Sequence, residues 1–302
     1  MLLSAIQLLL FLSLPPFLLG VINRVKARVA GRTGQPLLQP YFDLWRLLHK
    51  GAVYSTTTTW VFRAGPVVGL AAVATAGLLL SFGGAPAMLS FSGDFVLFAY
   101  LLGLARFFTA LAALDTGSAF EGMGAAREVS FASLAEPALF LCLVVLARAT
   151  GALSLSQMLG EGLGSAWSTS GPALLLTALA LFVVALAENA RIPVDDPNTH
   201  LELTMIHEVM VLDHSGPDFA FILYGAALKL FLFGALVVRL ALGFHFDSPW
   251  AALLAFLGGM LVFAVVVGTV ESVMARLRLS RVPQMLVGAS VLSVFALVLL
   301  LR

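Results

Sequence analysis

Apolar residues in this chain of 302 residues form long continuous runs that are separated by polar segments. A helix needs about 20 mostly apolar residues to span the hydrocarbon core of a bilayer. The runs that meet this requirement are residues 2–22, 61–82, 95–114, 131–149, 172–187, 219–242, 250–270 and 284–301. The strands of a membrane barrel would instead show short segments of alternating hydrophobicity. We therefore predict an all-α fold, a polytopic membrane helix bundle of eight spans in a single membrane domain that covers residues 1–302.

The composition supports this prediction and excludes several classes of function. Hydrophobic residues make up 60% of the chain and charged residues 11%, against about 45–50% and 25% in soluble domains. A formal net charge of +1 provides no basic surface for nucleic acid. The one cysteine cannot form an internal disulfide or hold an iron–sulfur cluster, which takes about four thiolates. We find no nucleotide-binding motif and no haem or metal ligand set, so we expect no cofactor bound by this chain.

The charged residues predict an orientation. Twelve of the seventeen Lys and Arg residues lie in or next to segments 23–60, 115–130, 188–218 and 271–283. The positive-inside rule places these segments in the cytoplasm and both termini outside. Most acidic residues lie on the same side, although Asp and Glu contribute little to orientation. This crowding indicates that a function on the cytoplasmic side uses carboxylates.

Three charged residues lie away from the ends of the predicted spans. A carboxylate such as Glu136 is costly at membrane depth, so we expect it to face the bundle interior or water, where it would hold or release a proton. The alternative is a neutral, hydrogen-bonded glutamate near the start of its helix. Lys229 can lose its proton and act as a relay, whereas Arg106 stays charged and acts as a counter-ion. For both cations a purely structural ion pair is an equal alternative.

The fifth span ends in a charged segment with two prolines. Pro193 and Pro197 prevent the helix from continuing past Glu188, so the charged residues that follow, among them Arg191, lie on irregular backbone next to the membrane. Such backbone is tolerated there when it is buried in protein or lines a wet cavity. A polar turn in solvent is the alternative. The acidic residues of this segment are Asp195 and Asp196.

The continuation, residues 199–212, has a helical pattern that carries Glu202 and Glu208. His200, His207 and His214 recur every seven residues and would share one face of an unbroken helix. We disfavour a metal site, because the zinc-binding helix motif places its two histidines four residues apart. Histidines that titrate or hydrogen-bond beside carboxylates fit this spacing better.

The segment 23–60 is too long for a simple connector between neighbouring helices. Residues 41–50 are amphipathic, with Phe42, Trp45 and Leu48 on one side, and they fit a helix that lies in the membrane interface or docks a soluble partner. Arg276 belongs to a second basic segment, for which ordinary orientation signalling is the alternative. The candidate docking residues are Arg32, Gln35, Gln39, Asp43, Arg46 and Arg276.

Three motifs resemble a known family over nearly the whole chain. They are GQPLLQP at residues 34–40, GAARE at 124–128 leading to Glu136, and ENARIPVD at 188–195. The chain resembles the eight-helix membrane subunit that anchors the peripheral arm of respiratory complex I and of related membrane-bound NiFe hydrogenases. HLELTMIHE at 200–208 and Glu271 followed by Arg276 are similar to the formate hydrogenlyase and hydrogenase-4 type.

The resemblance implies a non-catalytic subunit of an oxidoreductase complex in the cell inner (cytoplasmic) membrane. Its partners would be the hydrogenase large and small subunits, an iron–sulfur subunit and antiporter-like membrane subunits, with the NiFe centre and iron–sulfur clusters held by the partners. Arg191, Asp195 and Asp196 would shape the mouth of a proton funnel. The proton path would comprise Glu128, Glu136, Glu188, Glu202, Glu208 and Lys229.

Two other functions stay open at this point. One is the equivalent subunit of complex I, with a quinone as partner. The other is a stand-alone ion-coupled transporter. Transporters often contain inverted repeats with interrupted helices in both halves, whereas the irregular acidic segment here has no counterpart in the first half of the chain.

Overall fold

The computed structural model describes residues 2–160, 162–195, 205–243 and 248–301. Within these ranges, all regular secondary structure is helical. Eight helices in the described ranges are long and apolar enough to cross a membrane, which confirms the predicted fold class. They are α1 (Leu2–Val29), α3 (Trp60–Leu78), α4 (Asp94–Asp115), α5 (Ala119–Thr150), α7 (Gly162–Glu188), α8 (Gly216–Ala241), α9 (Pro249–Val273) and α10 (Val282–Leu300). The shorter elements are α2 (Gln39–Leu48), α6 (Leu155–Met158) and the 3-10 helices η1 (Glu208–Val211) and η2 (Leu279–Arg281).

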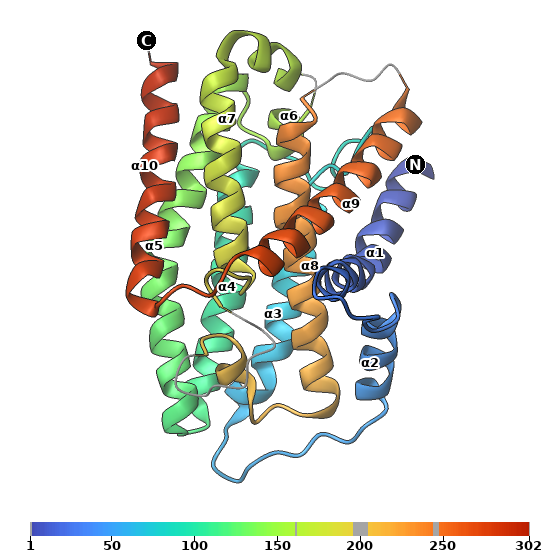
Figure 1. Ribbon diagram of the computed structural model, residues 1–302, viewed down its shortest axis with the longest axis vertical. Coiled ribbons are helices and arrows are strands. Elements are labelled where there is room, and N and C mark those ends of the chain that lie inside the picture. Colours follow the sequence, from blue (N-terminus) through green and yellow to red (C-terminus); the bar gives the residue numbers. More distant parts are fainter. Residues whose placement is uncertain (1, 161, 196–204, 244–247, 302) are drawn as a thin grey trace.

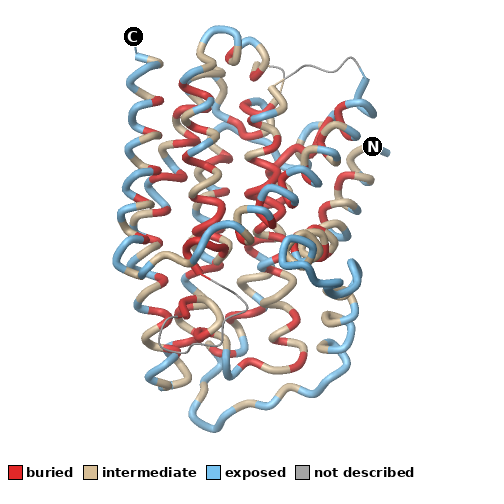
Figure 2. Tube along the Cα trace, in the orientation of Figure 1, coloured by how far each residue is buried: buried red, intermediate tan, exposed pale blue. Residues whose placement is uncertain are grey.

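Helix α8 lies at the centre of the bundle and contacts α1, α2, α3, α7 and α9. Helices α5, α7 and α10 pack together on one side of it, α1 and α9 on another, and α3 pairs with α4 (Figure 1). Buried residues follow the inward faces of the helices, and the outward faces are exposed (Figure 2). Helix α8 is apolar on nearly all sides, and a helix of this kind is stable when neighbouring helices cover several of its sides.

Aromatic rings fill the core where α1, α8 and α9 meet. The ring centroids of Phe11 and Phe82 lie 5.5 Å apart, those of Phe82 and Phe231 5.2 Å, and those of Phe231 and Phe256 6.1 Å. Such offset and edge contacts stabilise a core beyond the area that they bury. Gly77 of α3 allows this packing, since a Cβ atom there would lie 2.1 Å from the Phe11 ring.

Helix α1 bends in its middle, at Pro15 and Pro16 (Figure 1). Proline lacks the amide hydrogen of an ordinary helical residue, so Pro16 leaves the carbonyl of Leu12 without its helical donor. The hydroxyl of Tyr224 on α8 donates to this carbonyl at 2.7 Å, and that of Tyr41 on α2 donates to the carbonyl of Ser13. The bend is therefore tied to both neighbouring helices.

Two spans begin earlier than the apolar runs predict. Helix α5 starts at Ala119 rather than at residue 131, because the charged residues of its first turns are buried against other elements instead of being solvated in a loop. Helix α7 starts at Gly162 rather than at residue 172. Pro172 marks a kink in α7, where Ser170 leaves the helical conformation.

The prediction of a helix over residues 199–212 is wrong for the part that the structure describes. Residues 199–204 lie outside the described residues, and only η1 is helical in the remainder. His207 precedes η1 and His214 follows it, so these two histidines do not share a face of one helix. His214 instead stacks on Phe62 of α3, with ring centroids 3.9 Å apart.

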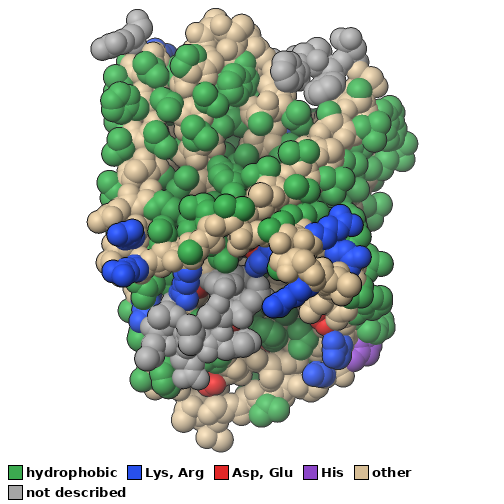
Figure 3. Space-filling model, in the orientation of Figure 1, with side chains coloured by type: hydrophobic (Ala, Val, Ile, Leu, Met, Phe, Trp, Pro, Cys, Tyr) green, Lys and Arg blue, Asp and Glu red, His purple; other side chains and the backbone are tan. Residues whose placement is uncertain are grey.

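Both ends of the chain lie in the upper half of Figure 1, and α2, η1 and the segment between α2 and α3 lie in the lower part. Figure 3 shows hydrophobic side chains over the upper part of this face and most of its Lys and Arg side chains below them. We call the lower part the loop end. Which side of the membrane it faces stays a prediction.

The bend of α1 generates a prediction. Tyr224→Phe removes the donor to Leu12 and should lower the free energy of unfolding by about 1 kcal/mol, the usual net worth of one hydrogen bond. Unfolding by SDS titration in mixed micelles measures this difference. Tyr100→Phe is the matched control, because Tyr100 is 74% exposed, and an equal loss in both variants would contradict the assigned role.

Candidate functional site

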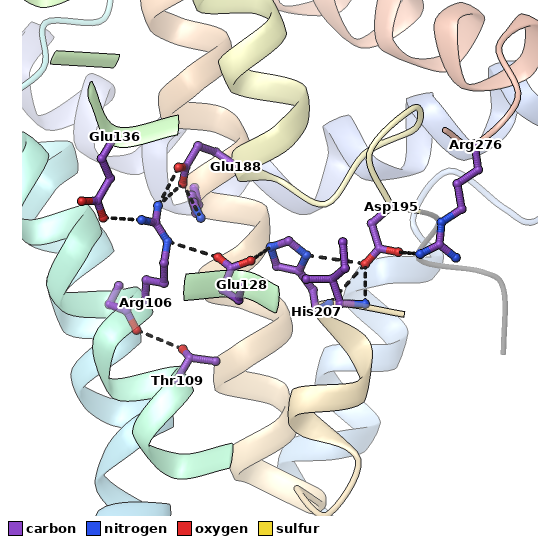
Figure 4. Close-up of polar contacts among 11 residues, drawn as sticks. Arg106, Thr109, Glu128, Glu136, Glu188, Asp195, His207 and Arg276 are labelled. Atoms are coloured by element: carbon purple, nitrogen blue, oxygen red, sulfur yellow. Dashed lines mark hydrogen bonds and ion pairs between the residues drawn. The ribbon is translucent and has the colours of Figure 1, made fainter. Parts of the chain in front are cut away.

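A buried arginine on α4 holds three carboxylates from two other helices (Figure 4). The Arg106 side chain is 7% exposed. Its Nη2 donates to Glu188 Oε1 on α7 at 2.6 Å, and its Nε lies 3.1 Å from Glu128 Oε1 on α5. Its Nη1 pairs with Glu136, also on α5. The planar guanidinium presents five N–H donors in fixed directions, so it can serve all three partners at once.

The ion pairs continue from Arg106 in two directions. Lys229 Nζ on α8 lies 3.0 Å from Glu188 Oε2. On the other side, Glu128 Oε2 lies 3.0 Å from His207 Nε2, and His207 Nδ1 lies 3.5 Å from Asp195 Oδ2. Arg276 Nη2 completes the series at 2.8 Å from Asp195 Oδ1. We call these residues the charge chain: Glu136, Arg106, Glu188, Lys229, Glu128, His207, Asp195 and Arg276.

The protonation of His207 decides the balance of the charge chain. Burial alone would lower the pKa of His207, but the neighbouring Glu128 and Asp195 carboxylates outweigh it and raise that pKa to about 9. His207 is therefore an imidazolium at neutral pH, and four cations face four carboxylates. Burial alone would raise the pKa of Asp195. The neighbouring His207 and Arg276 outweigh burial and hold that pKa below its usual range.

Side chains of Asp195 and of Arg127 on α5 hold the segment that carries His207 by hydrogen bonds to its backbone. Asp195 Oδ2 accepts the amide hydrogens of Ile206 at 3.1 Å and of His207 at 3.2 Å. Arg127 of α5 donates to the Met205 carbonyl at 3.1 Å. At Gly124 a Cβ atom would lie 2.9 Å from the Ile206 carbonyl oxygen, so only glycine permits this close approach.

A small cavity lies between the carboxylates of the charge chain. Its volume is about 10 Å³, and Glu128, Glu188 and His207 line it together with apolar residues of α5 and α10. This is about the room that one water molecule needs, and the polar groups supply the partners that a buried water requires.

A second ion-pair cluster lies beside the charge chain. Glu271, at the end of α9, has a fully buried carboxylate that pairs with Lys26 of α1 at 2.8 Å and with Arg191 at 3.2 Å. The Arg191 side chain thus pairs with Glu271, and the predicted role of Arg191 and Asp195 at a funnel mouth stays a prediction. The two residues meet through the backbone, where the Asp195 amide donates to the Arg191 carbonyl at 3.3 Å.

The structure brings Glu128, Glu136, Glu188, Lys229 and Asp195 of the predicted path into one connected set. Their proton-carrying role stays a prediction. Glu208 begins η1, directly after His207. Glu202 and Asp196 lie outside the described residues.

The sequence predicts that Glu136 faces the bundle interior or water, and the structure places it at the edge of the bundle. Its side chain is 52% exposed, although it pairs with Arg106. Pro137 and Phe140, which follow it on α5, are exposed as well, because this side of α5 is not covered by another helix of the chain. The carboxylate therefore stands at the outer surface of the bundle.

The candidate docking residues lie in two places. Gln39, Asp43 and Arg46 form a polar edge of α2, where Asp43 Oδ1 accepts from Gln39 at 2.9 Å and pairs with Arg46 at 2.8 Å. Arg32 and Gln35 lie in the exposed turn before α2. Arg276 instead belongs to the charge chain.

Sequence reasoning missed the positions of several residues in this site. It considered Arg106 and His207 but left their partners open, and it gave no role to Lys26 or Glu271. An arginine in mid-span signals that carboxylates must converge on it, but the pattern does not say from which helices. Among the described residues, no group of three His, Cys, Asp or Glu side chains is arranged to hold a metal ion.

The fold and the charge chain define a polytopic membrane subunit with a buried ionic network that reaches its surface at both ends. The family described as NADH dehydrogenase matches residues 2–301, and the chain belongs to this family.

Relatives of the chain are membrane subunits of larger complexes. It is 31% identical to formate hydrogenlyase subunit 4 of Escherichia coli over 291 residues, which cover 92% of each chain. It is 33% identical to hydrogenase-4 component C of the same organism over 79% of this chain and 74% of the relative. Identity to an NADH-quinone oxidoreductase subunit of Rubrobacter xylanophilus is 27%, over 80% of this chain and 74% of the relative.

A solved structure shares the fold. It is that of the membrane-bound sulfane sulfur reductase, an archaeal respiratory membrane complex, in which one chain superposes with a TM-score of 0.82. The alignment covers 99% of this chain and 98% of that chain at 20% identity.

The charge chain predicts a large effect of removing its central cation. Arg106→Leu leaves three carboxylates without their shared partner, and we expect a loss of about 3–5 kcal/mol in the free energy of unfolding, as for other broken buried pairs. SDS-titration unfolding measures it. Arg46→Leu removes an exposed pair and should cost at most about 1 kcal/mol; similar losses in both variants would contradict the buried network.

The raised pKa of His207 predicts a dependence of stability on pH. Its folded-state pKa of about 9 lies above the ordinary value of 6.5, so its contribution is complete below pH 6.5 and is lost as the pH rises through 9. His207→Gln should therefore destabilise the protein at pH 6 and much less at pH 10. Unfolding titrations at both pH values test this, with the exposed His49→Gln as control. A constant effect of His207→Gln would contradict the assignment.

Proposed function

We propose that this chain is the membrane anchor and proton-path subunit of a membrane-bound NiFe hydrogenase complex of the formate hydrogenlyase type, located in the cell inner (cytoplasmic) membrane. The charge chain carries this proposal, because it connects Glu136 at the outer surface of α5 with Asp195 and Arg276 near the loop end. The names of the Escherichia coli relatives support it, and their higher identities favour a hydrogenase over a quinone-reducing complex.

The side chains of the charge chain divide into proton carriers and fixed charges. Arg106 and Arg276 keep their protons at all relevant pH values and act as fixed charges. Carboxylates, imidazole and a buried lysine can exchange protons. A proton would therefore move between Glu188 and Glu128 through the water-sized cavity, and from Glu128 through His207 to Asp195.

Arg106 determines how favourably each neighbouring carboxylate takes up a proton. It stabilises Glu128, Glu136 and Glu188 as carboxylates, so a proton that enters one of them competes with the same cation. A unit charge that appears about 10 Å away in a medium of effective dielectric constant 20 changes such an energy by roughly 1.7 kcal/mol. A redox step in a peripheral subunit near Asp195 would change the charge there. It would thereby change how many of the carboxylates in the charge chain hold a proton.

The exposed end of the charge chain indicates a neighbour within the membrane. Glu136 is half exposed, and Tyr100, Leu104 and Phe107 form an exposed apolar stripe on the adjacent α4. A carboxylate that faces lipid is costly. We assign this face to an antiporter-like membrane subunit, whose own polar groups would take over the proton from Glu136.

The loop end would hold the peripheral subunits. Helix α2 exposes Phe42 and Trp45, next to the candidate docking residues Gln39, Asp43 and Arg46. An exposed apolar face with a charged edge is typical of a surface that another protein or the membrane interface covers. The hydrogenase large and small subunits and an iron–sulfur subunit would supply the NiFe centre and the iron–sulfur clusters.

Proton translocation by the assembled complex tests this function. In membrane vesicles, Glu188→Gln and Glu136→Gln should lower the protons moved per hydrogen formed by about ten-fold, because a neutral amide cannot pass on a proton. Dye quenching measures the proton gradient, and gas analysis measures hydrogen. Co-purification of the peripheral subunits with each variant shows that assembly is intact.

Asp43→Asn, an exposed carboxylate outside the charge chain, is the matched control and should leave the ratio unchanged. An unchanged ratio in both glutamate variants would refute the proton path. Absence of hydrogenase subunits from the wild-type complex would refute the proposed function as a whole.

A further inference from the structure

A groove of about 440 Å³ opens at the loop end, apart from the charge chain. One wall is the segment between α2 and α3, with Tyr54 and Ser55, and the other is the segment before α8, with Asp213 and Ser215. Phe62 of α3 also lines it. Ser55 and Asp213 are exposed, so a side chain from outside can enter.

Contacts within the chain hold the two walls together. Ser215 Oγ accepts the amide hydrogen of Val53 at 3.0 Å, and Phe62 stacks on the His214 ring at an interplanar angle of 9°. Asp115 accepts the amide hydrogen of Thr59 at 2.6 Å. The groove is thus formed without a ligand, which lowers the entropic cost of binding one.

One carboxylate lines the groove, and two others contact residues of its walls. Asp213 lines it, and its amide donates to Glu121 Oε1 at 3.0 Å. Asp218 lies behind Tyr54, whose hydroxyl hydrogen-bonds to it. Burial and the Asp218 carboxylate together raise the pKa of Tyr54, so this hydroxyl stays a donor. Arg63 lies over the Tyr54 ring, with its guanidinium carbon 4.2 Å from the ring centroid.

These carboxylates are not saturated by the chain itself. Glu121 is 1% exposed and Asp218 8%. Within the described residues, Glu121 Oε2 and Asp218 Oδ2 have no hydrogen-bond partner, and neither has Nδ1 of the buried His214. A buried polar atom without a partner is costly, and an ionised oxygen more so. The site therefore favours a ligand that brings positive charge and N–H donors.

We propose that this groove binds a lysine or arginine side chain of a peripheral subunit. An arginine would stack its guanidinium against the partly exposed Tyr54 ring and donate toward Asp213 and Asp218, since both aromatic faces and carboxylates attract it. The inference rests on the proposed function only in requiring a peripheral subunit. It names a docking site that lies outside α2 and outside the charge chain.

Cross-linking in the assembled complex tests the position of the partner. The photoreactive residue p-benzoyl-phenylalanine replaces Ser55 at the groove, or as a control Ser165, an exposed residue on α7. Illumination of membranes, purification and mass spectrometry identify what is linked. We expect position 55, and not position 165, to link to a peripheral subunit within a segment that contains lysine or arginine.

Neutral variants test the chemistry. Asp218→Asn and Asp213→Asn preserve shape and remove charge. In detergent-solubilised complex, we expect Asp218→Asn to weaken retention of the peripheral subunit about ten-fold, seen as release at lower NaCl concentration, because loss of a buried charge partner mainly speeds dissociation. Arg148→Gln, which neutralises an exposed charge in the last turn of α5, at the opposite end of that helix from Glu121, should change retention less than two-fold. Thermal unfolding of each purified chain shows whether it is folded.

The outcomes separate the two proposals. If position 55 links only to lipid, to a membrane subunit or to a segment without basic residues, the groove is not the docking site. The same conclusion follows if Asp213→Asn and Asp218→Asn release the partner at the wild-type NaCl concentration. Restored retention when Asp213→Lys is combined with an acidic residue at the linked position would support the inference. A wild-type chain that purifies without any peripheral subunit would overturn both proposals.

Discussion

The structure depends on one constraint: a guanidinium buried among membrane helices must be neutralised where it stands. Arg106 cannot lose its proton, and removal from water costs several kcal/mol unless carboxylates surround it. Glu128, Glu136 and Glu188 meet this demand from α5 and α7. The helices α4, α5 and α7 are thus fixed relative to one another by charge as well as by apolar packing. Three carboxylates carry more negative charge than one guanidinium neutralises. Lys229 and His207 supply further positive charge beside Glu188 and Glu128.

This ionic network also explains why irregular backbone is stable beside the bundle. The segment after α7 and the segment before η1 would expose amide and carbonyl groups in a low-dielectric environment. Asp195 accepts two of these amides, and Arg127 donates to a carbonyl. The same residues that satisfy the backbone belong to the charge chain or adjoin it. The proposed proton path therefore uses the same atoms that support the backbone, so a substitution here would affect both.

The loop end contains two acidic regions with different properties. The carboxylates of the charge chain are matched by cations of the same chain, so they suit internal transfer of protons. Those around the groove at Tyr54 include oxygens without partners in the described residues, so they suit a cation from outside. This difference in saturation, rather than the number of carboxylates, distinguishes the proposed proton path from the proposed docking site.

The amino-acid sequence by itself determined the class of the fold. Long apolar runs leave a chain no alternative to membrane helices, and most predicted spans agree with the observed helices to within a few residues. The early start of α5 escaped prediction because hydropathy counts Glu121, Arg127 and Glu128 as polar, whereas in the structure these residues contact other elements. The sequence also identified Glu136, Arg106 and Lys229 as costly groups within the spans, since that cost depends only on the residue and its depth.

Only the tertiary structure decided which partners they have. Arg106 alone pairs with residues 30 and 82 positions away in the sequence, and helix packing brings them within hydrogen-bond distance. Helix packing paired Arg191 with Glu271, left the Glu136 side chain half exposed, and put His207 between two carboxylates. Side-chain direction depends on how each helix is rotated against its neighbours. A pattern along one chain fixes the apolar faces of helices, but a helix that is apolar on all sides has no single rotation that its sequence prefers.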